Sequence, residues 1–91
     1  MSEAPWRVVV RSSTRRDIAR LPEAMAWAVL AFITDRLPTN PHRLGGELTG
    51  PFVGRRSARL GTYRIIYRID AEARTVYVLA VKARGDVYGI R

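Results

Sequence analysis

The residues best suited to carry out chemistry lie in the second half of the chain, where several positively charged side chains accompany a tyrosine near residue 91. The cations are Arg59, Arg64, Lys82 and Arg84, and the tyrosine is Tyr88. Guanidinium groups bind phosphate through paired, charge-assisted hydrogen bonds, so phosphate is their natural ligand. A phenol has a pKa of about 10 in water, and nearby cations lower that pKa by stabilising the phenolate. This combination indicates chemistry at a phosphate group, with Tyr88 as the proton acceptor.

The rest of the composition excludes several other kinds of site. The chain has no cysteine, and therefore no disulfide, thiol nucleophile or thiolate metal site. Its single histidine, His42, excludes a histidine-rich zinc centre and a pair of histidines for acid–base catalysis. Tyr88 has a second interpretation, because a tyrosine this close to a chain end also anchors a terminal tail. Asp86 lies among arginines and is expected to form an ion pair with one of them.

Length and charge limit the kind of protein that carries these residues. Ninety-one residues are enough for one domain, 1–91. Sixteen Lys and Arg against eight Asp and Glu give a net charge of +8, which opposes compaction unless a polyanion binds. Nucleic acid, an anionic membrane surface and an acidic protein are the partners that fit. The longest apolar run, 24–33, is about half the ~20 residues of a membrane helix, and no secretory signal opens the chain. We therefore expect a cytoplasmic protein.

The pattern of apolar residues predicts the elements that position these groups. Residues 6–11 are rich in valine and indicate a strand. Thr14 and Asp17 have the spacing of a helix start, at which a hydroxyl caps the first turn. A second helix is predicted to begin at Pro22 and to end before Pro38. Its apolar stripe has the spacing of an amphipathic helix and consists of Met25, Val29, Phe32, Ile33 and Leu37.

The remainder of the chain predicts a connection followed by three strands. The connection spans 38–50 and is rich in Gly and Pro. The strands are 53–60, 63–69 and 75–83, with loops at 61–62 and 70–74. Short loops join consecutive strands in antiparallel order, and two helices are available to cover one face of the sheet. The predicted fold class is α+β in the order β-α-α-β-β-β, a small antiparallel sheet with a helical hairpin packed on one face.

Hairpin register decides which cations share a face of the sheet. A two-residue first loop places Arg59 directly opposite Arg64. A five-residue second loop places Arg64 opposite Ala80. Lys82 and Arg84 have the side-chain parity of Ala80, so they join the two arginines on one face. The sequence therefore predicts four cations at one end of the sheet.

Other arginines on these strands extend the prediction. In the same register Arg55 lies opposite Arg68 on the cationic face, whereas Arg56 lies opposite Tyr67 on the other face. Like charges directly opposite one another cost about 0.2–1 kcal/mol per pair. A solvated sheet face is the alternative interpretation of any single arginine, but several convergent cations favour an anion site.

Two segments of the meander resemble the RelE/ParE toxin superfamily. They are Arg-Leu-Gly-Thr-Tyr-Arg-Ile-Ile-Tyr-Arg at 59–68 and Arg-Gly-Asp-Val-Tyr at 84–88, and the resemblance covers about 6–88. The most specific parts are Gly-x-Tyr-Arg at 61–64 and Arg-x-x-Val-Tyr at 84–88. The resemblance implies a RelE-like fold and a toxin of a type II toxin–antitoxin system.

The resemblance also implies an activity and roles for individual residues. RelE-type toxins are ribosome-dependent mRNA endonucleases that cut message in the ribosomal A site without a metal or other cofactor. By this likeness Arg64 stabilises charge on the scissile phosphate, and Arg84 protonates or stabilises the departing 5′ oxygen. Tyr88 activates the attacking 2′-hydroxyl, which leaves a 2′,3′-cyclic phosphate, and Arg59 helps to neutralise the phosphate. Residues expected to bind RNA or phosphate around them are Arg55, Arg56, Arg68 and Lys82.

Two positions depart from the family pattern, and three functions stay open. Lys82 stands where a small residue or a histidine is common, and it extends the set of cations. Ser57 stands where many members have a second basic residue, and Arg55 or Arg56 is available to compensate. The implied partners of an endonuclease are a cognate antitoxin, the ribosome and mRNA, with no membrane and no small-molecule cofactor. The first alternative is a ParE-type inhibitor of DNA gyrase, and the second is a non-catalytic basic module that binds RNA.

Overall fold

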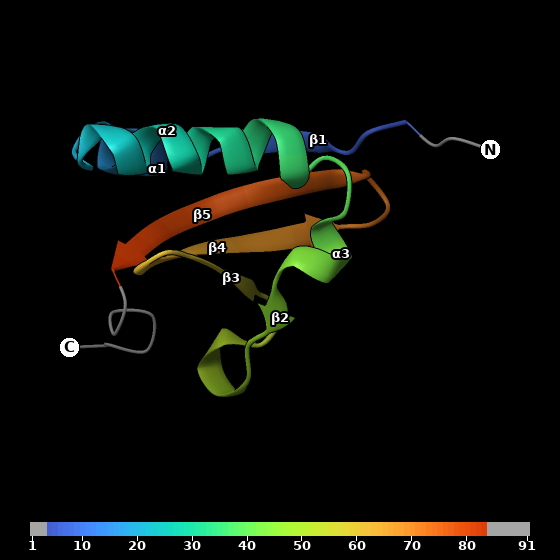
Figure 1. Cartoon of the computed structure of the whole chain (residues 1–91). Helices are drawn as coiled ribbons and strands as arrows, with labels where there is room; N and C mark the ends of the chain where they lie inside the picture. Colours follow the sequence, from blue (N-terminus) through green and yellow to red (C-terminus); the bar gives the residue numbers. More distant parts are fainter. Residues whose placement is uncertain (1–3, 84–91) are drawn as a thin grey trace.

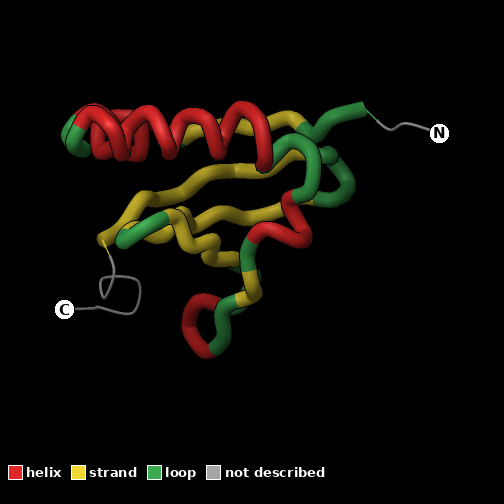
Figure 2. Tube along the Cα trace, viewed as in Figure 1, coloured by secondary structure: helices red, strands yellow, loops and turns green. Residues whose placement is uncertain are grey.

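The computed structural model describes residues 4–83 and contains helices and strands in the order shown in Figures 1 and 2. The helical elements are α1 (Ser12–Ala19), α2 (Glu23–Ala31), the π-helical turn η1 (Phe32–Arg36), α3 (Pro41–Leu44) and the 3-10 turn η2 (Gly50–Phe52). The strands are β1 (Arg7–Val10), β2 (Gly46–Glu47), β3 (Arg56–Leu60), β4 (Tyr63–Asp70) and β5 (Thr75–Ala83).

The elements form two layers. The strands make one five-stranded sheet in the order β1-β5-β4-β3-β2, and α1 and α2 lie over one of its faces (Figure 1). The connection after β2 lies on the opposite side of the sheet from these helices, where Leu48 and Phe52 pack against Ile66 and Ala80. We call the sheet face turned away from α1 and α2 the open face. The predicted α+β class is confirmed, as is the order of the two predicted helices and four predicted strands, and the structure adds α3 and the two-residue strand β2.

The sheet is mixed, which corrects the expectation that it is antiparallel. β2, β3, β4 and β5 pair with one another in antiparallel fashion, but β1 runs parallel to β5, with Val8 opposite Val76. No short loop joins β1 to β5. The helical hairpin after β1 carries the chain across the sheet, so the direction of this strand is not constrained by a tight turn.

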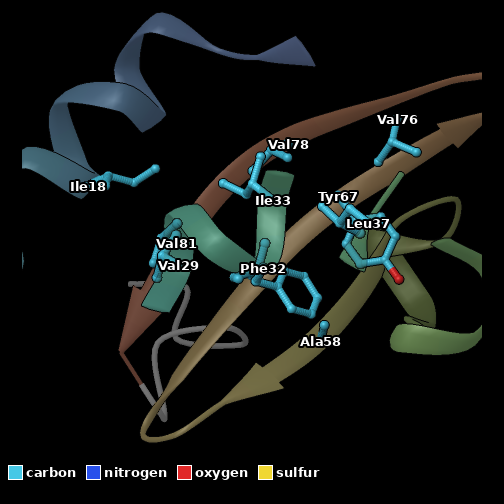
Figure 3. Packing of buried hydrophobic residues seen from close by; sticks show 11 residues of the cluster. Ile18, Val29, Phe32, Ile33, Leu37, Ala58, Tyr67, Val76, Val78 and Val81 are labelled. Carbon is cyan, nitrogen blue, oxygen red and sulfur yellow. The ribbon is translucent and has the colours of Figure 1, made fainter. Parts of the chain in front are cut away.

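The core lies between the helices and the sheet (Figure 3). Val29, Phe32, Ile33 and Leu37 of the predicted stripe are buried, and Met25 packs against them half-buried. The predicted single helix is divided, because η1 follows α2 and Leu37 donates its amide to the carbonyl of Phe32 at 3.0 Å. Within 4–83, no helix is long and apolar enough to cross a bilayer.

Thr14 links the helical layer to an irregularity in β5. Ile66 pairs with Ala80 but Tyr67 pairs with Val78, so Leu79 is an extra residue, a β-bulge. The buried Thr14 hydroxyl donates to the Leu79 carbonyl at 2.8 Å, 65 residues along the chain. The predicted capping role of Thr14 is wrong, since α1 begins two residues earlier and has no side-chain cap.

Replacing Thr14 by valine is expected to lower the free energy of unfolding by about 1–3 kcal/mol, because the shape is kept while a partly buried carbonyl loses its donor. Urea denaturation followed by circular dichroism measures the change. Thr34→Val is the matched control, because Thr34 is exposed and its hydroxyl bonds within its own helix. Equal effects of the two substitutions would contradict a special role for Thr14.

The predicted connection 38–50 contains more structure than its composition indicated. Pro41 begins α3, a position at which the missing amide of proline costs nothing. The buried Tyr67 hydroxyl donates to the Pro41 carbonyl at 2.6 Å. Burial raises the pKa of Tyr67, although the nearby Arg56 cation opposes the shift. A β-carbon at Gly45 would lie 2.8 Å from the Tyr67 hydroxyl, so this close approach requires glycine.

Candidate functional site

The first hairpin brings two predicted site residues together. Arg59 of β3 lies directly opposite Arg64 of β4, and Leu60 lies opposite Tyr63, as the two-residue loop predicts. Gly61 opens that loop with a φ of 62°, which glycine adopts without steric cost. The predicted register of this hairpin is confirmed.

The second hairpin brings a third cation beside Arg59 and Arg64, through a register that the sequence did not predict. Arg64 lies opposite Lys82, where Ala80 was expected. The register is thus shifted by two residues. One residue of this shift comes from the loop, which has four residues because Asp70 already pairs with Thr75. The other residue of the shift comes from the bulge in β5. A shift of two residues returns each side chain to the same face of the sheet, so the prediction that Lys82 shares the face of Arg64 still holds.

Arg59, Arg64 and Lys82 thus form a row across three neighbouring strands, which we call the cationic row. Neighbouring strands are about 4.8 Å apart, so the row spans roughly 10 Å of sheet at its backbone. Arg59 and Lys82 are exposed and Arg64 is half-buried. In the part of the chain that the structure describes, none of the three forms an ion pair. The row therefore presents uncompensated positive charge on the open face.

Ser57, one of the two positions at which the chain departs from the family pattern, contacts the cationic row. Its hydroxyl accepts a hydrogen bond from Nη1 of Arg64 at 3.4 Å, and Ser57 itself is 8% exposed. A second cation at this position would lie beside Arg64. Serine instead orients the guanidinium by a neutral contact.

An apolar cluster lies beside the cationic row on the open face. Ile66 and Ala80 occupy the next positions along β4 and β5, and Leu48 and Phe52 pack against them from the segment between β2 and β3. The cluster gives the segment 48–52 a fixed place beside the row.

Strand β3 begins only at Arg56, so the predicted strand 53–60 is too long by three residues.

Two further predicted cations, Arg55 and Arg68, lie on the open face at the other end of β4. They line a pocket of about 210 Å³ together with Arg11 and Tyr77. The Arg68 guanidinium carbon lies 4.4 Å from the centre of the Tyr77 ring, a cation–π contact. Sequence reasoning missed Tyr77, because β5 residues 77 and 82 have opposite parity and share a face only through the bulge.

Arg56, which was also predicted to bind phosphate, does not lie with Arg55 and Arg68 on the open face. Its side chain donates to the carbonyls of Gly45 at 3.1 Å and His42 at 2.8 Å, and pairs with Glu47 at 3.4 Å. It lies opposite Tyr67 on the helix-covered side of β3. These contacts give Arg56 a structural task, that of holding the segment 42–47 against the sheet.

The remaining predicted catalytic residues, Arg84 and Tyr88, lie outside the described residues, as does Asp86. β5 ends at Ala83, one residue after Lys82. In the sequence, Arg84 follows Lys82 of the cationic row by two positions. Between residues 4 and 83, no group of three or more His, Cys, Asp or Glu side chains is placed to hold a metal ion.

Comparison with known proteins gives matches over almost the whole chain. The family model described as the ParE toxin of type II toxin-antitoxin system, parDE, matches residues 8–88. Toxin RelG of Mycobacterium tuberculosis is 42% identical over 84 residues, which cover 92% of this chain and 97% of that protein. Toxin RelE of the same organism is 38% identical over 84 residues, covering 92% of this chain and 87% of the relative.

A solved structure has the same architecture. A chain in the crystal structure of the toxin-antitoxin complex RelBE2 from M. tuberculosis is similar with a TM-score of 0.83 and 41% sequence identity. The similarity covers 88% of this chain and 99% of that chain. The mixed sheet and helical hairpin described above are therefore found in an experimentally determined relative.

Proposed function

This chain belongs to the RelE/ParE family of toxins from type II toxin–antitoxin systems, and from this premise we propose that it is an endoribonuclease that cleaves mRNA on the ribosome. The observation that carries the proposal is the cationic row. Arg59 faces Arg64, Arg64 faces Lys82, and no carboxylate between residues 4 and 83 forms an ion pair with any of the three. Each opposed pair costs free energy of folding, and a bound phosphate removes that cost.

The row suits the charge that develops when a phosphodiester is cleaved. Attack on phosphorus makes a five-coordinate transition state whose non-bridging oxygens carry more negative charge than they do in the substrate. Guanidinium groups that are already in place stabilise this charge without reorganisation. Arg64 is the central cation, and the Ser57 hydroxyl orients it. Arg59 and Lys82 flank it on the neighbouring strands.

The proton transfers are assigned to the residues that follow β5. Tyr88 takes the proton of the ribose 2′-hydroxyl, and the 2′ oxygen then forms a bond to phosphorus. The bond from phosphorus to the 5′ oxygen breaks, and this oxygen takes a proton from Arg84, or from water where Arg84 only stabilises its charge. The products are a 2′,3′-cyclic phosphate and a free 5′-hydroxyl, so atoms and protons balance. The ribosome supplies the positioning of the message that this small face lacks.

The activity is tested by mapping the 5′ ends of mRNA by primer extension in cells that express the chain. Cleavage within translated codons is expected, and it should disappear in the double variant Arg64→Ala, Tyr88→Phe. Arg16→Ala is the control, because Arg16 is an exposed cation of α1, on the other side of the sheet. Equal cleavage by the active chain and the double variant would refute the assignment of these two residues.

A second function, inhibition of DNA gyrase, is favoured by one observation, the ParE description of the matching family model. The relatives at about 40% identity are instead named RelG and RelE, which favours the endonuclease. Gyrase-dependent DNA breaks with intact mRNA would reverse the ranking. Growth inhibition that survives loss of both Arg84 and Tyr88 would point to the third alternative, a non-catalytic basic module.

The proposed protein partner is a cognate antitoxin, and the outer surface of the helical layer offers a place for it. α2 carries one charged residue, Glu23, and exposes 66% of Trp27 and 39% of Leu30. A tryptophan in this alanine-rich helix is expected to pack against the sheet or against a partner protein, and its exposure favours the partner. A groove between the helices is lined mainly by apolar side chains, with Arg15 among them. An amphipathic antitoxin helix with an acidic edge fits both features.

Leu30→Glu is expected to weaken binding of the antitoxin by at least about tenfold, since it places an uncompensated carboxylate in an apolar contact. Leu30 is 39% exposed in the free chain, so the fold should tolerate the change. Isothermal titration calorimetry with the cognate antitoxin provides the measurement. Unaltered affinity would place the antitoxin elsewhere, and Glu23→Gln serves as the control on the same helix.

A further inference from the structure

The open face has a second basic site, separate from the cationic row. The pocket of about 210 Å³ collects three arginines from three places in the chain. Arg11 follows β1, Arg55 precedes β3, and Arg68 lies within β4. These positions are far apart in sequence, so only the sheet brings the three cations together.

The pocket lacks a compensating negative charge. Its lining contains no carboxylate, and within 4–83 none of the three arginine side chains forms an ion pair. Three like charges around one small cavity repel one another, which the fold tolerates at a cost that a bound anion removes. The charge pattern therefore indicates an anionic ligand.

Tyr77 adds a flat surface to this anion site. Its ring packs against the Arg68 guanidinium at 4.4 Å, which holds the guanidinium plane in a defined orientation. Single-stranded nucleic acids bind by stacking their bases on aromatic rings and arginine planes, while cations contact the phosphates. An acidic peptide would use the cations but not the stacking surface. Nucleic acid is thus the ligand that matches both features.

The pocket and the cationic row lie along one path. Arg64 and Arg68 are four residues apart on β4, which corresponds to about 13 Å along the strand. Between them Ile66 is only 8% exposed, because Leu48 and Phe52 pack over it, so a strand that joins the two sites passes beside Ile66, over the half-buried Ala80 of β5. A phosphate at Arg64 and a phosphate at Arg68 can therefore belong to one strand that crosses the open face, with more than one nucleotide between them.

We propose that the pocket formed by Arg11, Arg55, Arg68 and Tyr77 binds a nucleotide of the message that flanks the scissile phosphate. The proposal rests on the endonuclease function, and it adds a subsite at which one phosphate is neutralised and one base stacks. The cavity is smaller than the ~300–1,000 Å³ typical of small-molecule sites. This size suits one phosphate with part of its nucleoside.

The test measures binding of a fluorescent single-stranded RNA of about ten nucleotides, 2′-O-methylated so that it cannot be cut. Arg68→Gln is expected to weaken binding about fivefold to tenfold and to reduce the slope of log K against log salt by about 0.7. Arg16→Gln removes the same charge from an exposed site on α1 and is the matched control. Equal losses in the two variants would overturn the proposal.

The aromatic surface has its own test. Tyr77→Leu should weaken binding several-fold, whereas Tyr77→Phe should keep the affinity because the ring remains. Equal behaviour of the two would refute stacking. Competition by a polyglutamate peptide as strong as that by unlabelled RNA would assign the pocket to an acidic protein instead.

Cleavage assays separate this proposal from the endonuclease function. If mRNA is cut on ribosomes with a KM that Arg68→Gln leaves unchanged, the subsite is refuted and the function stands. If no mRNA is cut but Arg68→Gln still weakens RNA binding more than Arg16→Gln does, the function is refuted and the RNA site stands.

Discussion

Replacing Arg64 by glutamine is expected to reduce cleavage of mRNA on the ribosome by about 10²–10³-fold, the loss that follows removal of one preorganised donor to a developing oxyanion. Arg64 is the central cation of the row, with Arg59 on one side and Lys82 on the other. Neither neighbour can replace it, because each projects from its own strand. Single-turnover cleavage of programmed ribosomes measures the chemical step directly.

The same substitution is expected to leave the fold intact. Arg64 faces a like charge on each side, and relief of such repulsion is worth about 0.2–1 kcal/mol per pair. The variant should therefore unfold at the same or a higher urea concentration than the parent chain. Loss of activity together with loss of stability would show that Arg64 has a structural role. Arg43→Gln, an exposed cation of α3, is the control for charge alone.

Replacing Tyr67 by alanine is expected to lower the free energy of unfolding by about 3–5 kcal/mol, the range found for truncation of buried aromatic residues. Tyr67 is 0% exposed, and its hydroxyl holds α3 through the Pro41 carbonyl. A chain of this length has a total stability of roughly 5–14 kcal/mol, so the variant approaches the limit of folding. Urea denaturation followed by tryptophan fluorescence measures the loss.

Tyr67→Phe isolates the hydroxyl and predicts a pH dependence. Below pH 10 the variant should lose about 1–3 kcal/mol, because the Pro41 carbonyl is left without its donor. Burial raises the pKa of Tyr67 in the folded chain. The folded state therefore keeps its proton where the unfolded state releases one, and this contribution is lost as pH rises above about 10.

Parent chain and Tyr67→Phe should consequently converge in stability above pH 10. The variant has no hydroxyl at this position to titrate, so the difference between the two chains reports on Tyr67 alone. Urea denaturation of both chains between neutral pH and pH 11 provides the measurement. A constant difference across this range would contradict the raised pKa.

The helices and the first hairpin could be predicted because their signals are local. Val29, Ile33 and Leu37 recur at the helical period, and burial of one stripe follows from that spacing. Gly61 supplies the positive φ of a two-residue loop, and this loop alone determines that Arg59 faces Arg64. Arg84 and Tyr88, proposed as the proton-transfer groups, remain predictions from the family resemblance.

Other features could not be predicted because they depend on contacts between distant segments. The α3 turn has no apolar periodicity of its own, and it is held by the Arg56 side chain and the Tyr67 hydroxyl from the sheet. The same contacts withdraw Arg56 from the open face, although its residue type resembles that of Arg55. Nothing in the immediate sequence distinguishes these two arginines except side-chain parity.

The sequence by itself determined that positive charge gathers on one sheet face, because turn length and strand parity act over a few residues. Only the tertiary structure decided that Lys82 lies opposite Arg64 and that Tyr77 shares their face. Tyr77 lies opposite Arg68 because the loop before β5 has four residues. Lys82 depends in addition on the bulge at Leu79, whose carbonyl is satisfied by Thr14 from the first helix. A bulge changes the parity of every later residue in its strand. Since its stabilising partner lies 65 residues away, it becomes defined only when helix and sheet pack together.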